Sequence, residues 1–219
     1  MQPGALTVAY RLGPRNLYVM PFPLFLFGNV VFFAMQSLTG TKIFSTPLAM
    51  HLQSDIWGPA AQQLIVHHLD AVRTALDSYS SVFDQAVALN AKSLIILMVF
   101  AFAVFPPIVF LGSRVPFAVH VVFSLHLYAF VQLLFSAALV IVAIDVWLGG
   151  AGLGSTAFDH SLSLILLFAC AAYLYFATGR VYEARGVGRI LRAGVLTLAV
   201  AAIVLGYRFV LLPITLWTT

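Results

Sequence analysis

The sequence has very little charge: of its 219 residues only 8% are Asp, Glu, Lys or Arg, whereas 62% are apolar. This composition excludes an ordinary water-soluble domain, in which about a quarter of the residues are charged. Cysteine is almost absent too, because Cys170 is the only one. A single cysteine cannot form a disulfide within the chain or supply a cysteine-rich zinc site. The sequence therefore predicts an integral membrane protein.

Long apolar runs make up most of the chain. A helix needs roughly 20 residues to cross a hydrocarbon layer about 30 Å thick. The runs that meet this requirement are about 17–38, 93–111, 116–147, 160–178 and 192–216. We therefore expect an all-α integral membrane protein with about five transmembrane helices, folded as a single membrane domain over 1–219.

The distribution of basic residues predicts the orientation of the chain. With the N-terminus in the cytoplasm, only Lys42, Arg73 and Lys92 lie in the outer segments, which is the bias that the positive-inside rule describes. All three tryptophans then lie near the outer interface, where indole rings are enriched. An odd number of spans puts the C-terminus on the outer side. The cytoplasmic basic residues in this topology are Arg11, Arg15, Arg114, Arg180, Arg185, Arg189 and Arg192.

The segment 43–90 is the one sizeable part expected outside the membrane. Its apolar residues recur at alternating spacings of four and three, which predicts one amphipathic helix over about 59–89. Such a stripe packs on its own protein or docks a partner. His67 and His68 are adjacent, so they point about 100° apart on a helix and do not by themselves predict a metal site. The stripe consists of Ile65, Leu69, Val72, Leu76, Tyr79, Phe83 and Ala86.

Polar residues in the third span need a reason, because polar groups within a bilayer face protein, a cavity or a bound group. Steps of four residues turn only about 40° on a helix, so His120, Ser124, Tyr128 and Gln132 form one slowly winding row. His126 lies about 120° from the nearest part of that row. The two histidines are therefore not expected to form one site on a single face.

Two interpretations of these polar residues stay open. In the first, His120, His126 and Tyr128 contact a lipid, a quinone or a pigment. In the second, Ser124, Tyr128 and Gln132 form hydrogen bonds with neighbouring helices. Asn29 and Gln36 of the first span are seven residues apart, so they share a helix face and could meet the polar row in the bundle interior.

No cofactor, metal site or catalytic residue is predicted with any specificity. Haem held by two histidines needs a second helix with a histidine at matching depth, and none is available. The glycine-rich segment 149–154, between Asp145 and Asp159, lacks the lysine and the serine or threonine of a phosphate-binding loop. No charged residue falls clearly at the expected midplane of a span, which argues against a proton pump. The basic excess lies in loops and gives no indication of nucleic-acid binding.

Three stretches resemble an uncharacterised bacterial family of multi-span membrane proteins. The resemblance implies a bacterial inner-membrane location and a multi-pass fold, but no activity. Members of that family often carry an N-terminal zinc ribbon, and no ribbon is present in this sequence. The similar stretches are Pro3-Gly4 with Tyr10-Arg11-Leu12-Gly13, Arg15, Tyr18, Pro21-Phe22-Pro23-Leu24-Phe25-Leu26 and Phe32-Phe33; Asn90-Ala91-Lys92-Ser93-Leu94; and the run from His120 to Phe130.

Two functions are consistent with these features. We favour a non-catalytic accessory or scaffold subunit of a larger membrane complex, such as a respiratory or photosynthetic one, contacting membrane lipids and other subunits through the helix at about 59–89. The alternative is a small lipid-handling or quinone-handling enzyme or transporter. Its cavity would be lined by Asn29, Gln36, His120, Ser124, Tyr128 and Gln132.

Overall fold

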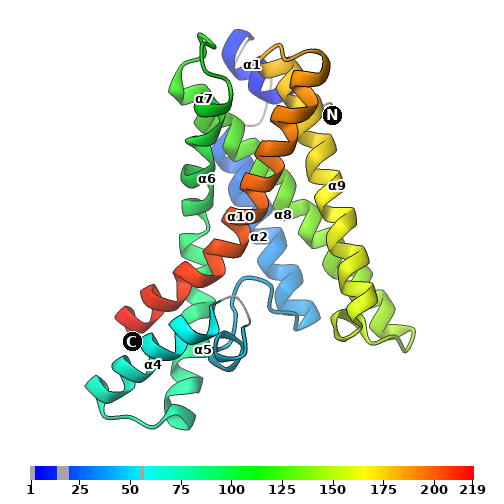
Figure 1. The fold of residues 1–219 in the computed structure, drawn as a ribbon. Helices are drawn as coiled ribbons and strands as arrows, with labels where there is room; N and C mark the ends of the chain where they lie inside the picture. Colours follow the sequence, from blue (N-terminus) through cyan, green and yellow to red (C-terminus); the bar gives the residue numbers. More distant parts are fainter. Residues whose placement is uncertain (1–2, 14–19, 55–56) are drawn as a thin grey trace. The chain divides into compact units, whose positions relative to one another are not determined.

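The computed structural model describes residues 3–13, 20–54 and 57–219, and within these ranges the regular elements are all helical (Figure 1). The elements in chain order are α1 (Ala5–Leu12), α2 (Pro21–Thr39), α3 (Leu48–Leu52), α4 (Gly58–Val72), α5 (Leu76–Leu94), α6 (Ile96–Ala103), α7 (Phe105–Val109), α8 (Phe117–Trp147), the 3₁₀ turn η2 (Gly152–Gly154), α9 (Thr156–Val181) and α10 (Gly186–Thr218).

Four helices, α2, α8, α9 and α10, are long and apolar enough to cross a membrane. A fifth crossing is available if α5 and the α6 to α7 segment count as one span, bent by 48° at the break between them. These helices confirm the predicted all-α membrane protein. Each predicted span falls on one of them, although residues 17–19 of the first span lie outside the described part of the chain.

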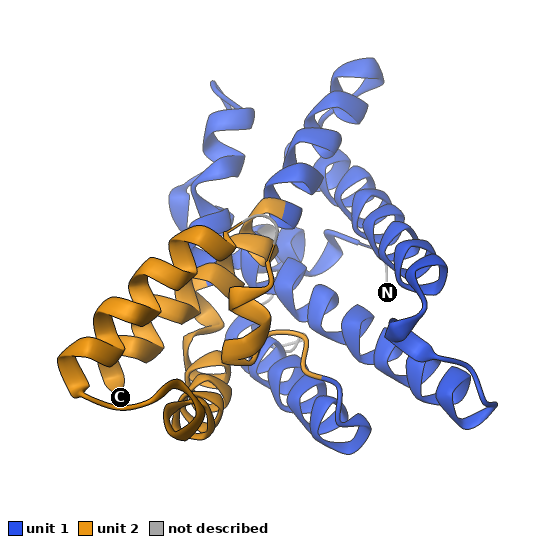
Figure 2. Cartoon of the chain, turned by 60° about the horizontal axis from the view of Figure 1, so that its bottom comes forward, with its two compact units in different colours: residues 1–41, 98–201 blue, residues 42–97, 202–219 orange. Residues whose placement is uncertain are grey.

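The chain divides into two compact units, coloured separately in Figure 2. Unit 1 comprises residues 1–41 and 98–201, and unit 2 comprises residues 42–97 and 202–219. One boundary falls in the connection between α2 and α3, and the other two fall inside α6 and α10, so both of these helices contribute to both units.

In unit 1, α2 packs along α8, and a glycine determines how closely they approach. A Cβ added to Gly28 would lie 2.9 Å from Oε1 of Gln132 and 3.3 Å from the carbonyl oxygen of Ala129. Only a residue without a side chain fits such a distance without displacing its neighbours, as at other close helix crossings in membranes. Phe25 and Phe32 of α2 are fully buried on the same packed face.

A second glycine brings α1 against α9. Gly4 has a φ of 80°, and a Cβ there would lie 2.9 Å from Cα of Ala177. Left-handed backbone and close approach both favour glycine at this position. Arg180 donates from Nη1 to the carbonyl oxygen of Pro3 at 3.5 Å and so holds the same end of α1.

The glycine-rich connection between α8 and α9 is folded around a carboxylate. Oδ2 of Asp145 accepts the backbone N–H of Gly152 at 2.9 Å. A Cβ on Gly150 would overlap that carboxylate, and Gly149 and Gly152 have positive φ values of 89° and 54°. The glycines therefore serve a tight turn around Asp145.

The predicted single helix at about 59–89 is divided in the structure into α4 and α5. Arg73 adopts a left-handed conformation with φ 54°, and the N–H of Thr74 bonds the carbonyl oxygen of Leu69, as in a Schellman-type helix end. The apolar stripe is interrupted here, since Val72 and Leu76 are exposed, and it resumes on α5, where Tyr79 and Phe83 are buried. This break was not predicted because the alternating spacing of four and three continues through it, and the turn contains neither glycine nor proline.

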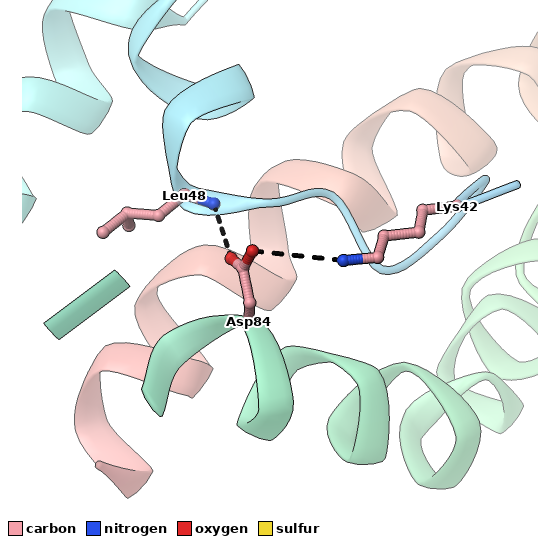
Figure 3. A network of polar contacts seen from close by, with 3 residues as sticks. All are labelled: Lys42, Leu48 and Asp84. Atoms are coloured by element: carbon pink, nitrogen blue, oxygen red, sulfur yellow. Dashed lines mark hydrogen bonds and ion pairs between the residues drawn. The ribbon is translucent and has the colours of Figure 1, made fainter. Parts of the chain in front are cut away.

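Unit 2 is held by polar bonds to backbone atoms. Asp84 of α5 accepts the N–H of Leu48, the first residue of α3, at 3.0 Å, and its other oxygen lies 4.0 Å from Nζ of Lys42 (Figure 3). The C-terminal part of α10 is bound in the same manner: Tyr207 donates to the carbonyl oxygen of Ala91, and Arg208 donates to that of Ile43.

Candidate functional site

His120 lies buried near the start of α8 and forms a hydrogen bond with Tyr182, just after α9. Nδ1 of His120 is 2.8 Å from the Tyr182 hydroxyl, and the two rings are nearly parallel at 9° with centroids 5.5 Å apart. The Tyr182 ring also stacks on the Phe110 ring, with the ring centroids 4.2 Å apart and an angle of 7° between the ring planes. His120 thus belongs to an aromatic cluster that joins the α7–α8 and α9–α10 connections.

His126 faces a different partner. Its Nδ1 is 2.9 Å from Oγ1 of Thr7 in α1, and this bond is buried. Its Nε2 is buried and has no hydrogen-bond partner in the described part of the chain. The two histidines therefore contact different elements, as their angular separation on the helix predicts.

Tyr128 and Gln132 are almost fully buried, but their polar atoms are unsatisfied. The hydroxyl of Tyr128 and both side-chain polar atoms of Gln132 have no hydrogen-bond partner among the described residues. The Tyr128 ring packs edge-on against Phe102 at 6.2 Å. The Gln132 amide lies at the Gly28 crossing. A buried polar group without a partner costs about 1 to 3 kcal/mol, so these atoms are the most informative of the polar row.

Ser124 of the row and Ser136, one turn beyond Gln132, are both satisfied within α8 itself. Ser124 donates to the carbonyl oxygen of His120, and Ser136 to that of Gln132, both at 2.8 Å. The expectation that Ser124 bonds a neighbouring helix is therefore wrong for its hydroxyl proton. A serine in a helix can always reach the carbonyl one turn back, which in a bilayer is the nearest acceptor.

The polar residues of the first span lie on α2, the helix that packs along α8. Gln36 is buried and Asn29 is half-buried. The structure thus brings the helices of the predicted polar interior together.

Thr7 and Tyr182 were not predicted as site residues. Both lie in segments that composition placed outside the spans, and their partners are more than 60 positions away in the sequence. Neither residue belongs to a motif. Only the fold reveals that each satisfies one of the two histidines in α8.

His51 of α3 is a further buried polar residue that was not predicted. Its ring lies beside Trp57 and edge-on to Phe83, and its Nδ1 accepts the indole N–H of Trp57 at 3.3 Å. This bond places the proton on Nε2, which is buried without a partner in the described chain. Burial, assisted by the positive charge of Arg208 and opposed by Asp84, lowers the pKa of His51 to about 4.

Among the described residues, no three His, Cys, Asp or Glu side chains are grouped as metal ligands. The chemistry of the site is that of neutral donors and acceptors: imidazole, phenol, hydroxyl and amide groups. Such groups can orient a polar ligand or hold helices together. They supply no paired carboxylates and no nucleophile with an adjacent base.

These features define a multi-pass, all-α membrane protein with a buried, uncharged polar row on one central helix. No model of a known protein family, no curated protein and no solved structure matches the chain. The resemblance to a bacterial multi-span family, and the bacterial inner-membrane location that it implies, therefore stay predictions.

Proposed function

We propose that this protein is a non-catalytic accessory or scaffold subunit of a larger membrane complex. The observation that carries the proposal is the contrast between its polar interior and its outer surface. His120 and His126 bond other elements of the same unit, Tyr182 after α9 and Thr7 of α1, so the two histidines act as internal tethers. What the protein offers to other molecules is the apolar surface of its helices.

That surface supports a role in contacting lipid and protein within the membrane. In α2 and in α9 only 28% of the most apolar 18-residue stretch is buried, and in α10 39% of it is buried. Large side chains such as Phe27, Phe168 and Phe176 are more than half exposed. Helices with so much exposed apolar surface are covered by acyl chains or by other transmembrane helices, because contact of that surface with water is unfavourable.

We also propose that the N-terminus is cytoplasmic and the C-terminus lies on the outer side of a bacterial inner membrane. Support comes from unit 1, where α1 packs on α9 and the α7–α8 and α9–α10 connections share one aromatic cluster. These segments contain Arg11, Arg114 and the four arginines in or beside the α9–α10 connection. This gathering of basic residues favours the cytoplasmic side.

The test is extraction of the native membrane with a mild detergent, followed by size separation and mass spectrometry of the co-migrating proteins. We expect stoichiometric co-migration with other membrane subunits. A species containing only the 23.8 kDa chain would contradict the proposal. Cysteine accessibility at an introduced site in the α9–α10 turn would test the orientation separately.

A second candidate function, lipid or quinone handling, is favoured by one observation. Nε2 of His126, the hydroxyl of Tyr128 and the amide of Gln132 are buried without partners. A quinone carbonyl or a lipid headgroup could satisfy such donors. The same fraction should then contain a bound lipid or quinone that Tyr128→Phe reduces, while the matched substitution Tyr173→Phe on α9 leaves it unchanged.

A further inference from the structure

The α7–α8 and α9–α10 connections of unit 1 lie side by side because of a chain of ring contacts. Phe110, at the end of α7, stacks on Tyr182, at the end of α9. The guanidinium of Arg192 from α10 lies 5.2 Å from the centre of the Phe110 ring. The end of α7 thus meets the end of α9 and the start of α10, about 70 residues further along the chain.

Three arginines lie at this contact or close to it in the sequence, and we call them the basic end of unit 1. Arg192 lies over Phe110, Arg114 is four residues after Phe110, and Arg185 is three residues after Tyr182. All three are exposed, and none forms an ion pair within the described chain. The neighbouring Arg189 is engaged elsewhere: its Nε donates to the carbonyl oxygen of Tyr175 at 2.7 Å, and its guanidinium lies 3.9 Å from that ring's centre. Unpaired positive charge is therefore concentrated in the other three.

Little in this part of the chain neutralises the basic end. The two connections comprise residues 110–116 and 182–185, and Glu183 is the only acidic residue among them. The first turn of α10 contains no acidic residue either. The N-terminus of a helix carries partial positive charge, so α10 adds to the local potential.

Large exposed apolar side chains lie within six positions of the same arginines in the sequence. A soluble anion would leave these side chains facing water, whereas a phospholipid places its phosphate beside the arginines and its acyl chains on the apolar residues. Charge and hydrophobicity thus complement one kind of molecule. The exposed apolar side chains are Ile108, Leu111, Phe117, Val187, Ile190 and Leu191.

We infer that the basic end of unit 1 binds the headgroup phosphate of an anionic phospholipid. Arg192, held over Phe110, is the central contact, and Arg114 and Arg185 reach the headgroup from the two connections. The inference goes beyond the scaffold function and does not depend on it, because it concerns the isolated chain.

The test uses the purified full chain in detergent, titrated with phosphatidylglycerol or phosphatidylcholine of the same acyl chains and analysed by native mass spectrometry. We expect tighter binding of phosphatidylglycerol, weakened by salt. Arg192→Gln should weaken it about fivefold, and Arg114→Gln combined with Arg192→Gln should weaken it further. Arg192→Lys should retain most of the binding, which separates loss of charge from loss of fold.

The matched control is Arg73→Gln, which removes one exposed charge from unit 2 and should leave the preference unchanged. Equal binding of both lipids by the native chain would overturn the inference. So would an equal loss of binding in Arg73→Gln and Arg192→Gln, since the preference would then reflect net charge alone. Inorganic phosphate that displaced the lipid at similar concentration would show a free-anion site in place of a lipid site.

Discussion

The buried histidines of unit 1 and the polar tethers of unit 2 bond different kinds of groups. In unit 1 the two histidines of α8 bond neutral side chains, the hydroxyl of Thr7 and the phenol of Tyr182, and the charged side chains that bond backbone atoms, Asp145, Arg180 and Arg189, lie near helix ends. In unit 2 several bonds involve a charged side chain and a backbone atom, as with Asp84 at Leu48 and Arg208 at Ile43. The difference follows the expected surroundings, because burying a charge in a bilayer costs far more than burying a neutral group.

This comparison indicates how each unit should respond to its environment. Stability that rests on close packing and neutral bonds should depend little on salt or pH. Stability that rests on a carboxylate, an ammonium and a buried histidine should depend on both. The following four changes, ordered by expected size, test that division.

The largest effect is expected at the α2–α8 crossing of unit 1. Gly28→Leu should destabilise the protein by about 3 kcal/mol, since even a Cβ there lies 2.9 Å from Gln132 and 3.3 Å from the Ala129 carbonyl. Unfolding in detergent, followed by circular dichroism, would measure it. Gly194→Leu is the control, because a Cβ on Gly194 meets nothing within 4 Å. Equal stability of the two variants would show that the crossing is not tightly packed.

The second effect concerns pH and unit 2. The pKa of His51 is lowered to about 4 in the fold, from an ordinary value of 6.5. Between these values the unfolded chain binds a proton that the folded chain does not. The free energy of unfolding is therefore highest above pH 6.5 and falls by on the order of 2 kcal/mol as the pH falls towards 4. This figure allows for solvent screening.

Fluorescence of Trp57, which donates to His51, would follow this loss in a chain whose exposed Trp147 and Trp217 are replaced by phenylalanine. His51→Asn should remove the dependence between pH 6.5 and 4. A pH profile that is the same in both chains would exclude His51 as its cause.

A smaller effect is expected at the bond between α1 and α8. Thr7→Val removes the hydroxyl that bonds Nδ1 of His126, so that Nδ1 joins the buried Nε2 in having no hydrogen-bond partner in the described chain. This loss should cost about 1.5 kcal/mol. The loss should be the same at low and high salt. Thr74→Val, at an exposed hydroxyl, should change little. If the loss of stability in Thr7→Val disappeared in high salt, the Thr7–His126 bond would not be a bond between two neutral groups.

The smallest effect is expected for Asp84→Asn. Asparagine can still accept the N–H of Leu48, so only the ion pair with Lys42 is lost. In this pair the side chain of Asp84 is 32% exposed and that of Lys42 is 50% exposed. We expect about 0.5 kcal/mol at low salt and nothing measurable at high salt. Unfolding midpoints at two ionic strengths would measure it. Asp84→Ala, which also removes the acceptor at the start of α3, should cost more at both.

The spanning helices were predictable from the sequence because the length of an apolar run is itself the physical requirement for crossing a bilayer. The polar row was predictable for a similar reason, since helical geometry alone places His120, Tyr128 and Gln132. The break between α4 and α5 was not, because an arginine in a left-handed conformation leaves no signal in the pattern. The partners of His120 and His126 were not predictable either, since Tyr182 and Thr7 reach them only through tertiary packing.

The close pairing of α2 with α8 has a consequence for how the chain is made. A protein synthesised from its N-terminus completes α2 long before α8, with α3 to α7 emerging between them. During that interval Gly28 and Phe32 have no α8 to pack against, so the packed face of the first helix stays open within the insertion machinery or the lipid. Assembly of unit 1 therefore awaits the third apolar segment, and a chain truncated before residue 117 should leave its first helix unpartnered and open to degradation.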